Sequence, residues 1–286
     1  MTTLVPKLAR ALETPAEGCC QTRLAAGEVA FRPAMGPPMP GRSFITKKFH
    51  WWVKDDEAFW EHQRAMLASL KSDQGIYSSD SLIVWGRNLG FLDDTAFVAA
   101  WEKHADAMHE RGILWRTAAL VWAARQALRQ DGDFVECGCY AGTSMRVVMD
   151  AVDLGSRQVF LYDLFEHSSD MNHHAMPEHG PDLYERVRTR FADFQNVSVI
   201  KGFVPDSFSQ GVPDKISFAH IDMNNAPAEI GALEALAPRF TPGAIIVLDD
   251  YGQLPYHAQH LAEKAWFAER GKPILEIPTG QGVIIW

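Results

Sequence analysis

Carboxylates follow two apolar segments in the C-terminal half of the chain. Asp222 comes directly after residues 216–221, and Asp249 and Asp250 follow residues 244–248. If these segments are neighbouring strands of a parallel sheet, the three side chains converge at its carboxyl edge, where clustered carboxylates repel unless a cation or protons offset their charge. Because oxygen ligands suit a hard ion such as Mg²⁺, we expect Asp222, Asp249 and Asp250 to bind a divalent metal. The alternative is that Asp249 or Asp250 caps the following helix or turn.

A glycine-containing turn leads from the first apolar segment of this half into a helical pattern. Its spacing is Glu136-x-Gly138-x-x-x-Gly142, and Thr143 follows in the helix. Glycine lets the backbone approach a ligand closely, and the unpaired N–H groups of a helix start suit a carboxylate or a phosphate. Tyr140 replaces the middle glycine of the dinucleotide fingerprint, so the pattern disfavours NAD, whereas Glu136 suits a cationic ligand. We expect these five residues to contact a cofactor; the alternative is a tight strand–helix turn.

Two further apolar segments end in residues that suit a nucleoside. Asp163 ends the second segment, 25 residues after Gly138, where an acidic residue commonly binds both ribose hydroxyls. That ribose is common to S-adenosylmethionine and NAD. Phe203 follows Gly202 at the end of the third segment and could form one wall of an adenine slot. A plain β-turn explains this pair nearly as well.

The elements that must position these residues alternate along the chain. Helical faces separate five short apolar segments, which cover residues 134–137, 159–162, 197–200, 216–221 and 244–248. This alternation predicts βαβ units and a parallel sheet buried on both faces. Two final apolar segments, residues 274–277 and 283–286, predict a hairpin and hence an antiparallel edge. We therefore expect an α/β, Rossmann-like domain over residues 131–286.

The N-terminal part of the chain has a different composition. Residues 1–48 are rich in proline and glycine and predict a flexible or irregular arm. Residues 49–130 show helical spacing and hold seven of the nine tryptophans, which predicts a helical extension that packs on the following domain. This extension could serve as a lid or provide substrate or homodimer contacts. Trp115 and Arg116 could line a pocket from the helical side, although core packing is the preferred interpretation.

Composition and apolar patterning argue against several kinds of partner and location. The formal net charge of −9 argues against a nucleic-acid partner, because phosphate neutralisation needs a basic excess. The four cysteines show no CxxC spacing and form no disulfide framework, so we expect a reducing, cytoplasmic location. No signal peptide and no run of 18 apolar residues is present, so we expect no membrane partner.

Six segments resemble a known family. FVECGCYAG, YDLFE, KGFVPDSF, HIDMNN, PGAIIVLDDYG and PTGQGVIIW occur in order between residues 110 and 286. They resemble the class I S-adenosylmethionine-dependent methyltransferases of the macrocin O-methyltransferase type. The resemblance implies a seven-stranded sheet with a reversed terminal strand, S-adenosyl-L-methionine as cofactor and a divalent metal held by carboxylates.

The resemblance also implies roles for individual residues. Glu136 and Gly138 would lie beside the methionine part of the cofactor, and Asp163 would bind its ribose. Asp222 would contact the cofactor, ligate the metal and could also serve as the base, while Asp249 and Asp250 would complete the metal site. Sugar-modifying members continue with Gly-Asp-Leu-Tyr after the strand-four aspartate, whereas this chain has Met-Asn-Asn-Ala. This departure leaves the sugar substrate open.

The predicted reaction is methyl transfer to a hydroxyl of a small molecule, such as a natural product or a sugar. Metal coordination would stabilise the alkoxide, and Asp222 is the first choice for the base. His257 is the second choice, since it follows Asp250 by seven residues, although a solvated helical face explains it as well. The polar, histidine-rich residues 166–180 could form a lid over the substrate.

Two other functions compete with this prediction. One is a nicotinamide-dependent oxidoreductase on a similar sheet, which Tyr140 and the three aspartates oppose. The other is a non-catalytic binding protein on a methyltransferase fold, which the complete set of acidic residues makes less attractive.

Overall fold

The computed structural model describes residues 42–47, 49–168, 171 and 175–286. Most of the predicted N-terminal arm lies outside these residues, as do His173 and His174 of the histidine-rich segment. None of the described helices is both long enough and apolar enough to span a membrane.

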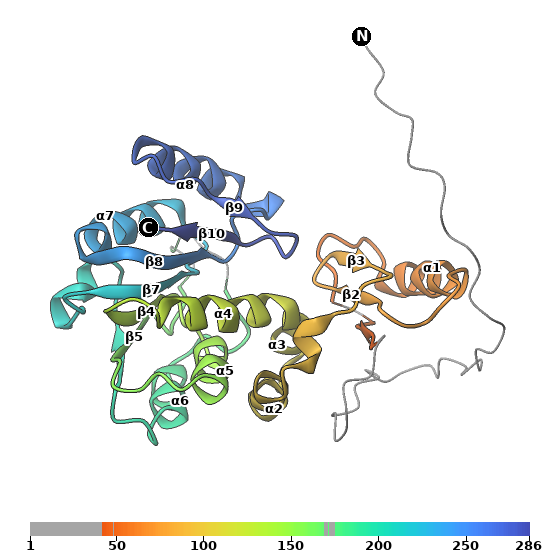
Figure 1. The fold of residues 1–286 in the computed structure, drawn as a ribbon, viewed down its shortest axis with the longest axis horizontal. Helices are drawn as coiled ribbons and strands as arrows, with labels where there is room; N and C mark the ends of the chain where they lie inside the picture. The colour runs from red at the N-terminus through yellow and green to blue at the C-terminus, as the bar shows by residue number, and fades with distance from the viewer. Residues whose placement is uncertain (1–41, 48, 169–170, 172–174) are drawn as a thin grey trace, which may run out of the picture.

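A seven-stranded sheet forms the centre of the fold (Figure 1). From one edge to the other, its strands are β6 (Val197–Lys201), β5 (Val159–Asp163), β4 (Asp133–Cys137), β7 (Ile216–Ile221), β8 (Phe240–Leu248), β10 (Gly282–Ile285) and β9 (Leu275–Glu276). The five strands from β6 to β8 are parallel, and β10 runs antiparallel to both β8 and β9. The predicted Rossmann-like sheet with a reversed terminal strand is therefore confirmed.

Helices cover both faces of this sheet (Figure 1). In chain order, the helices of the described residues are α1 (Asp56–Ala68), α2 (Thr95–His104), α3 (Met108–Gly112), α4 (Leu114–Ala127), α5 (Thr143–Ala151), α6 (Leu183–Arg190), α7 (Ala226–Leu236) and α8 (His257–Glu269), with short 3₁₀ turns at Gly90–Asp93, Asp206–Gln210, Ala237–Arg239 and Leu254–Tyr256. Of these, α1 lies beside the smaller N-terminal sheet and not on the seven-stranded one (Figure 1). Phe134 of β4 packs in the core with α4, α5 and α6, whereas its neighbour Val135 packs with α7 and α8. Strands buried on both faces explain why the sequence shows apolar runs instead of alternation.

The N-terminal region contains a second, smaller sheet besides its four helices. Its strands are β1 (Phe44–Ile45), β2 (Tyr77–Ser79) and β3 (Leu82–Val84), in the order β1-β2-β3. Asp80 and Ser81 form the turn between β2 and β3, and both have a positive φ. Helix α4 packs in the same core as α5 and the large sheet, so the N-terminal region and the large sheet share one core. The sequence predicts only helices here because these strands are two or three residues long.

Two buried carboxyl groups repel each other between α7 and α8. Glu229 and Glu263 are both fully buried. Burial raises the pKa of Glu229 well above its usual range, and burial raises the pKa of Glu263 to about 7. Glu229 also accepts hydrogen bonds from the backbone N–H groups of Met223 and Asn224, at 3.0 and 3.1 Å, in the loop that follows β7. The folded state therefore favours protonated carboxyls at this helix contact.

Replacing Glu263 with glutamine should make the folded protein less sensitive to rising pH. A raised carboxyl pKa means that the folded state holds a proton which the unfolded state has already released, so stability present at low pH is lost as pH rises through the folded pKa. Relative to wild type, Glu263→Gln should gain about 1.4 kcal/mol of unfolding free energy per pH unit between pH 5 and 7. Urea denaturation of both proteins at pH 5, 6 and 7 measures this difference. Glu269→Gln, at an exposed position of the same helix, is the control. A stability difference independent of pH would contradict the assignment.

Candidate active site

A cavity of about 590 Å³ lies at the carboxyl ends of β4, β5, β7 and β8. Seven of the eight predicted cofactor residues line it: Glu136, Gly138, Tyr140, Thr143, Asp163, Phe203 and Asp222. Phe49, Trp51 and Trp52, from the segment before α1, form part of its wall. Parallel strands place their carboxyl ends on one edge, which brings residues from distant parts of the sequence around one space.

Gly138 lies where the loop after β4 meets the loop after β7. Its φ is +90°, and a Cβ atom there would lie 1.8 Å from the backbone oxygen of Asp222. Asp222 N–H donates to the Cys137 carbonyl at 2.8 Å, which holds the two loops together. Glycine is therefore required at this position by both backbone conformation and space. Gly142 has a different role, because it precedes α5 with a φ of +74° and packs against the ring of Phe191.

Asp163 holds the glycine turn in place. One carboxylate oxygen accepts the N–H of Tyr140 at 2.7 Å, and the other accepts the N–H of Phe165 at 2.6 Å. Thr143 is held as well, because its hydroxyl donates to Glu110 and accepts from Arg190. These contacts organise the loop between β4 and α5 before any ligand is present.

The three predicted metal ligands converge at the same edge, but two of them bind an arginine. Arg116 Nη1 of α4 donates to Asp249 Oδ2 at 2.9 Å and to Asp250 Oδ1 at 2.7 Å. Arg116 also donates to both carboxylate oxygens of Asp80, from Nε at 2.6 Å and from Nη2 at 3.1 Å. Neither Asp249 nor Asp250 caps a helix, since Gln253 precedes the following 3₁₀ turn and Tyr256 precedes α8.

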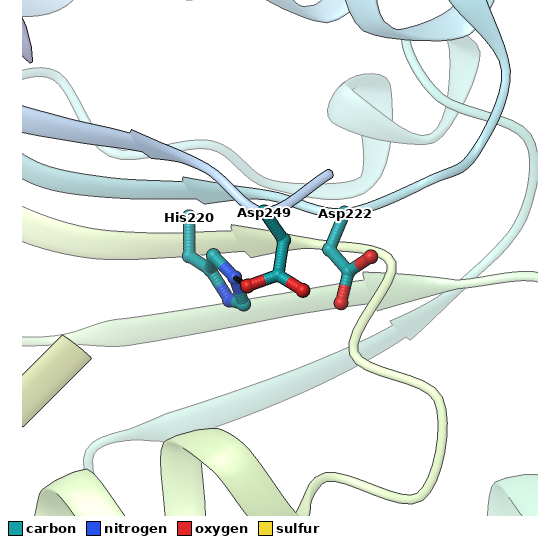
Figure 2. A group of neighbouring side chains, drawn as sticks. All are labelled: His220, Asp222 and Asp249. Carbon is teal, nitrogen blue, oxygen red and sulfur yellow. Dashed lines mark hydrogen bonds and ion pairs between the residues drawn. The ribbon is translucent and has the colours of Figure 1, made fainter. Parts of the chain in front are cut away.

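A buried histidine extends this network across the sheet. His220 Nδ1 lies 2.8 Å from Glu136 Oε1, and His220 Nε2 lies 3.4 Å from Asp249 Oδ1, which also accepts a hydrogen bond from Gln281 at 2.8 Å. Figure 2 shows the imidazole beside Asp249, with Asp222 on the other side of that carboxylate. Burial opposes the charged imidazole, yet the two carboxylates raise the pKa of His220 well above its usual range.

The remaining two carboxylates differ electrostatically from Asp249. Burial raises the pKa of Asp222 well above its usual range, and the charges of Asp249 and Asp250 raise it further. Burial raises the pKa of Asp250 to about 6, although Arg116 opposes this shift. Burial would also raise the pKa of Asp249, but Arg116 and His220 lower it below its usual range. The edge thus combines an ionised Asp249 with an Asp222 that binds protons readily.

Comparisons with known proteins agree with this geometry. Residues 135–251 match the sequence profile of a methyltransferase domain. These residues are therefore similar to a methyltransferase domain. The predicted resemblance to class I S-adenosylmethionine-dependent methyltransferases is therefore confirmed.

Three named methyltransferases are similar to this chain. The 8-demethyl-8-(2,3-dimethoxy-alpha-L-rhamnosyl)-tetracenomycin-C 4'-O-methyltransferase of Streptomyces olivaceus is 29% identical over 146 residues, which cover 42% of this chain and 53% of that protein. The chain thus matches about half the length of this curated relative. The O-methyltransferase NovP superposes with a TM-score of 0.53 and 19% identity over 63% of this chain and 83% of NovP. The calicheamicin methyltransferase CalS11 superposes with a TM-score of 0.50 and 18% identity over 66% and 84% of the two chains. Both structures share the fold.

As arranged, the acidic edge of the seven-stranded sheet does not fit a divalent metal. His220, Asp222 and Asp249 do place possible ligand atoms within 4.8 Å of one another. However, a metal that bridged Asp249 and Asp250 would lie against the guanidinium of Arg116, which carries a positive charge at every accessible pH. Asp249 Oδ1 is also occupied by Gln281 and His220. The negative charge at this edge is therefore offset by protein cations.

The structure does not bring His257 into the cavity. His257 is exposed at the start of α8, and its ring faces His260 with centroids 6.0 Å apart. The preceding residue, Tyr256, lines the cavity instead. Among the two predicted bases, only Asp222 reaches the space where a substrate would bind.

The described part of the histidine-rich segment borders the cavity. Met171, Met176 and His179 line it, and the N–H of Glu178 donates to the hydroxyl of Tyr140 at 2.9 Å. The described part of the segment is thus adjacent to the cavity, and its role as a lid stays a prediction.

Several residues of this network were not predicted from the sequence, or were assigned another role. Asp80, Glu110, His220 and Gln281 were not among the predicted site residues, and Arg116 was assigned mainly to core packing. A signal was present for two of them. Arg116 is a charged residue at a buried position of α4, and His220 lies inside a fully buried strand. Buried charged groups need partners, so both positions indicated a polar network.

Proposed function

We propose that this protein is an S-adenosylmethionine-dependent methyltransferase that acts on a hydroxyl group of a small molecule. The observation that carries the proposal is the turn from Gly138 to Thr143, which Asp163 holds against the cavity of a methyltransferase domain. The cavity volume of about 590 Å³ lies within the range of small-molecule and cofactor sites.

Two carboxylates fit the cofactor. Glu136 Oε2 is buried and has no hydrogen-bond partner among the described residues, while Oε1 binds His220. An orphaned carboxylate oxygen at the cavity wall suits the α-ammonium group of S-adenosylmethionine. Asp163 lines the cavity at the end of β5, where an acidic residue suits the two ribose hydroxyls.

Two observations support a hydroxyl group of a small molecule as the methyl acceptor: the name of one relative and the residues of the cavity wall. The Streptomyces olivaceus relative is an O-methyltransferase of a rhamnosyl tetracenomycin. In this chain, the half-exposed Trp51 and the exposed Trp52 line the cavity and offer aromatic faces to a sugar ring or a planar natural product. We therefore favour a glycosylated or aromatic small molecule as the methyl acceptor.

Asp222 is the residue that we assign as the base. When bound, S-adenosylmethionine supplies a methyl group on a sulfonium, which leaves as a neutral thioether. Asp222 takes the hydroxyl proton onto a carboxylate oxygen, and its raised pKa makes that carboxylate a stronger base near neutral pH. The loop from Gly138 to Thr143 and the aromatic wall orient the reactants and exclude water. The predicted metal assistance is not part of this proposal, because Asp249 and Asp250 bind Arg116.

Replacing Asp163 with alanine should weaken the binding of S-adenosylhomocysteine roughly 100-fold, because both the ribose acceptor and two backbone hydrogen bonds of the cofactor loop are lost. Isothermal titration calorimetry measures the change. Asp153→Ala is the matched control, because Asp153 also accepts a backbone N–H, from Gly155 at 2.9 Å, but in an exposed turn. Equal affinity of the two variants would contradict the assignment.

The cofactor that stabilises the protein distinguishes a methyltransferase from a nicotinamide-dependent oxidoreductase. The proposal expects S-adenosylmethionine to raise the melting temperature and NADH to leave it unchanged. It also expects methyl transfer to one of a panel of glycosides and phenols, detected as S-adenosylhomocysteine release. Stabilisation by NADH alone would favour an oxidoreductase, and cofactor binding without transfer to any acceptor would favour a binding protein.

A further inference from the structure

A buried arginine joins three aspartates from distant parts of the chain. Only 5% of the surface of Arg116 is exposed, and Asp80, Asp249 and Asp250 are also buried. The guanidinium forms a two-pronged contact with Asp80 and donates a third and a fourth hydrogen bond to Asp249 and Asp250. Planar guanidinium groups match carboxylates in this way, whereas an ammonium group does not.

The position of this guanidinium is the one that a bridging cation would take. Arg116 Nη1 alone contacts both Asp249 and Asp250, the two consecutive carboxylates at the end of β8. Arg116 is also one of the residues that line the cavity. A small divalent ion needs near-octahedral oxygen coordination at about 2.1 Å, so it could not share these two carboxylates with a guanidinium in the same space.

His220 and Gln281 bind the second carboxylate oxygen of Asp249. They occupy Asp249 Oδ1, while Arg116 occupies Oδ2. Each oxygen of Asp249 is therefore directed at a protein donor. Asp249 is arranged as the centre of a hydrogen-bonded network that runs from Glu136 to Asp80, not as a metal ligand.

We infer that Arg116 takes the place of a divalent cation in this protein. Resting on the proposed methyl transfer, the inference makes Arg116 a positioning residue: it fixes Asp249 and Asp250 and supplies a permanent positive charge at the substrate end of the cavity. Asp80 ties this charge to the turn between β2 and β3, so the N-terminal sheet completes the site. Methyl transfer then needs no added metal.

Metal titration tests the inference without an assay of methyl transfer. Mn²⁺ is added to the full chain and followed by electron paramagnetic resonance, with Mg²⁺ calorimetry in parallel. Wild type should bind no stoichiometric Mn²⁺, whereas Arg116→Gln should gain one site per chain, with affinity at least roughly tenfold above wild type. The double variant Arg116→Gln/Asp249→Asn should lose that site. Arg125→Gln is the control, because Arg125 lies on the same helix but binds Asp94.

Two results would overturn the inference. One is stoichiometric Mn²⁺ binding by wild type that Asp249→Asn removes, and this result decides the question even if Arg116→Gln fails to fold. The other is a folded Arg116→Gln variant that binds no Mn²⁺. Calorimetry of wild type with S-adenosylhomocysteine tests the proposed function separately. If wild type did not bind S-adenosylhomocysteine, the methyltransferase proposal would be wrong, but the Mn²⁺ result would still stand.

Discussion

Replacing Gly138 with alanine should abolish S-adenosylhomocysteine binding and lower the free energy of unfolding by more than about 4 kcal/mol. The added Cβ would lie 1.8 Å from the Asp222 carbonyl oxygen and 2.5 Å from its carbon, and the residue has a φ of +90°. Neither neighbour is a flexible side chain, so the loops after β4 and β7 must separate. That separation would also move Asp222, the proposed base, away from the cofactor loop.

The matched control for this substitution is Gly90→Ala. Gly90 has no atom within 4 Å of its added Cβ and no positive φ, so this variant should keep wild-type affinity. Urea denaturation and titration calorimetry on both variants give the two quantities. If Gly138→Ala bound the cofactor product as well as Gly90→Ala does, the close contact between the two loops would be wrong.

Replacing Asp249 with alanine should cost about 3–5 kcal/mol of unfolding free energy, because it leaves buried cationic donors without their shared acceptor. Arg116, His220 and Gln281 all donate to this carboxylate. The loss should exceed that of an ordinary polar truncation, since both charged partners lie in the interior. Chemical denaturation followed by tryptophan fluorescence measures it.

An exposed ion pair is the control for Asp249. Asp131 pairs with Lys215 at 2.7 Å, but both side chains are largely exposed to solvent. Asp131→Ala should leave the denaturation midpoint nearly unchanged, because solvent screens such a pair. Equal midpoints for the two variants would show that the network around Asp249 does not stabilise the fold.

Strand positions and strand ends could be predicted from the sequence because they depend on local patterns. The buried segments before Asp163, Asp222 and Asp249 are largely apolar, and each becomes a strand of the parallel sheet. Parallel strands share one carboxyl edge, so the sequence also placed these three carboxylates in one region. The final hairpin followed from two apolar runs around a turn.

The N-terminal sheet could not be predicted in the same way. Strands β1, β2 and β3 contain two or three residues each, and β2 has the sequence YSS. Such segments show no period, and they become strands through pairing with distant residues. His257 illustrates a related limit, because the turn between Tyr251 and Tyr256 decides that Tyr256, and not His257, reaches the cavity.

The sequence by itself determined the class of domain, the succession of strands along the chain and the strand ends at which its acidic residues lie, because hydrophobic periodicity and glycine conformation act over a few residues. Only the tertiary structure decided which cation meets those acids. Arg116 lies 133 residues before Asp249, and Asp80 lies 36 residues before Arg116. Ion pairs across such separations depend on how helices dock on a sheet, and no local pattern encodes that docking.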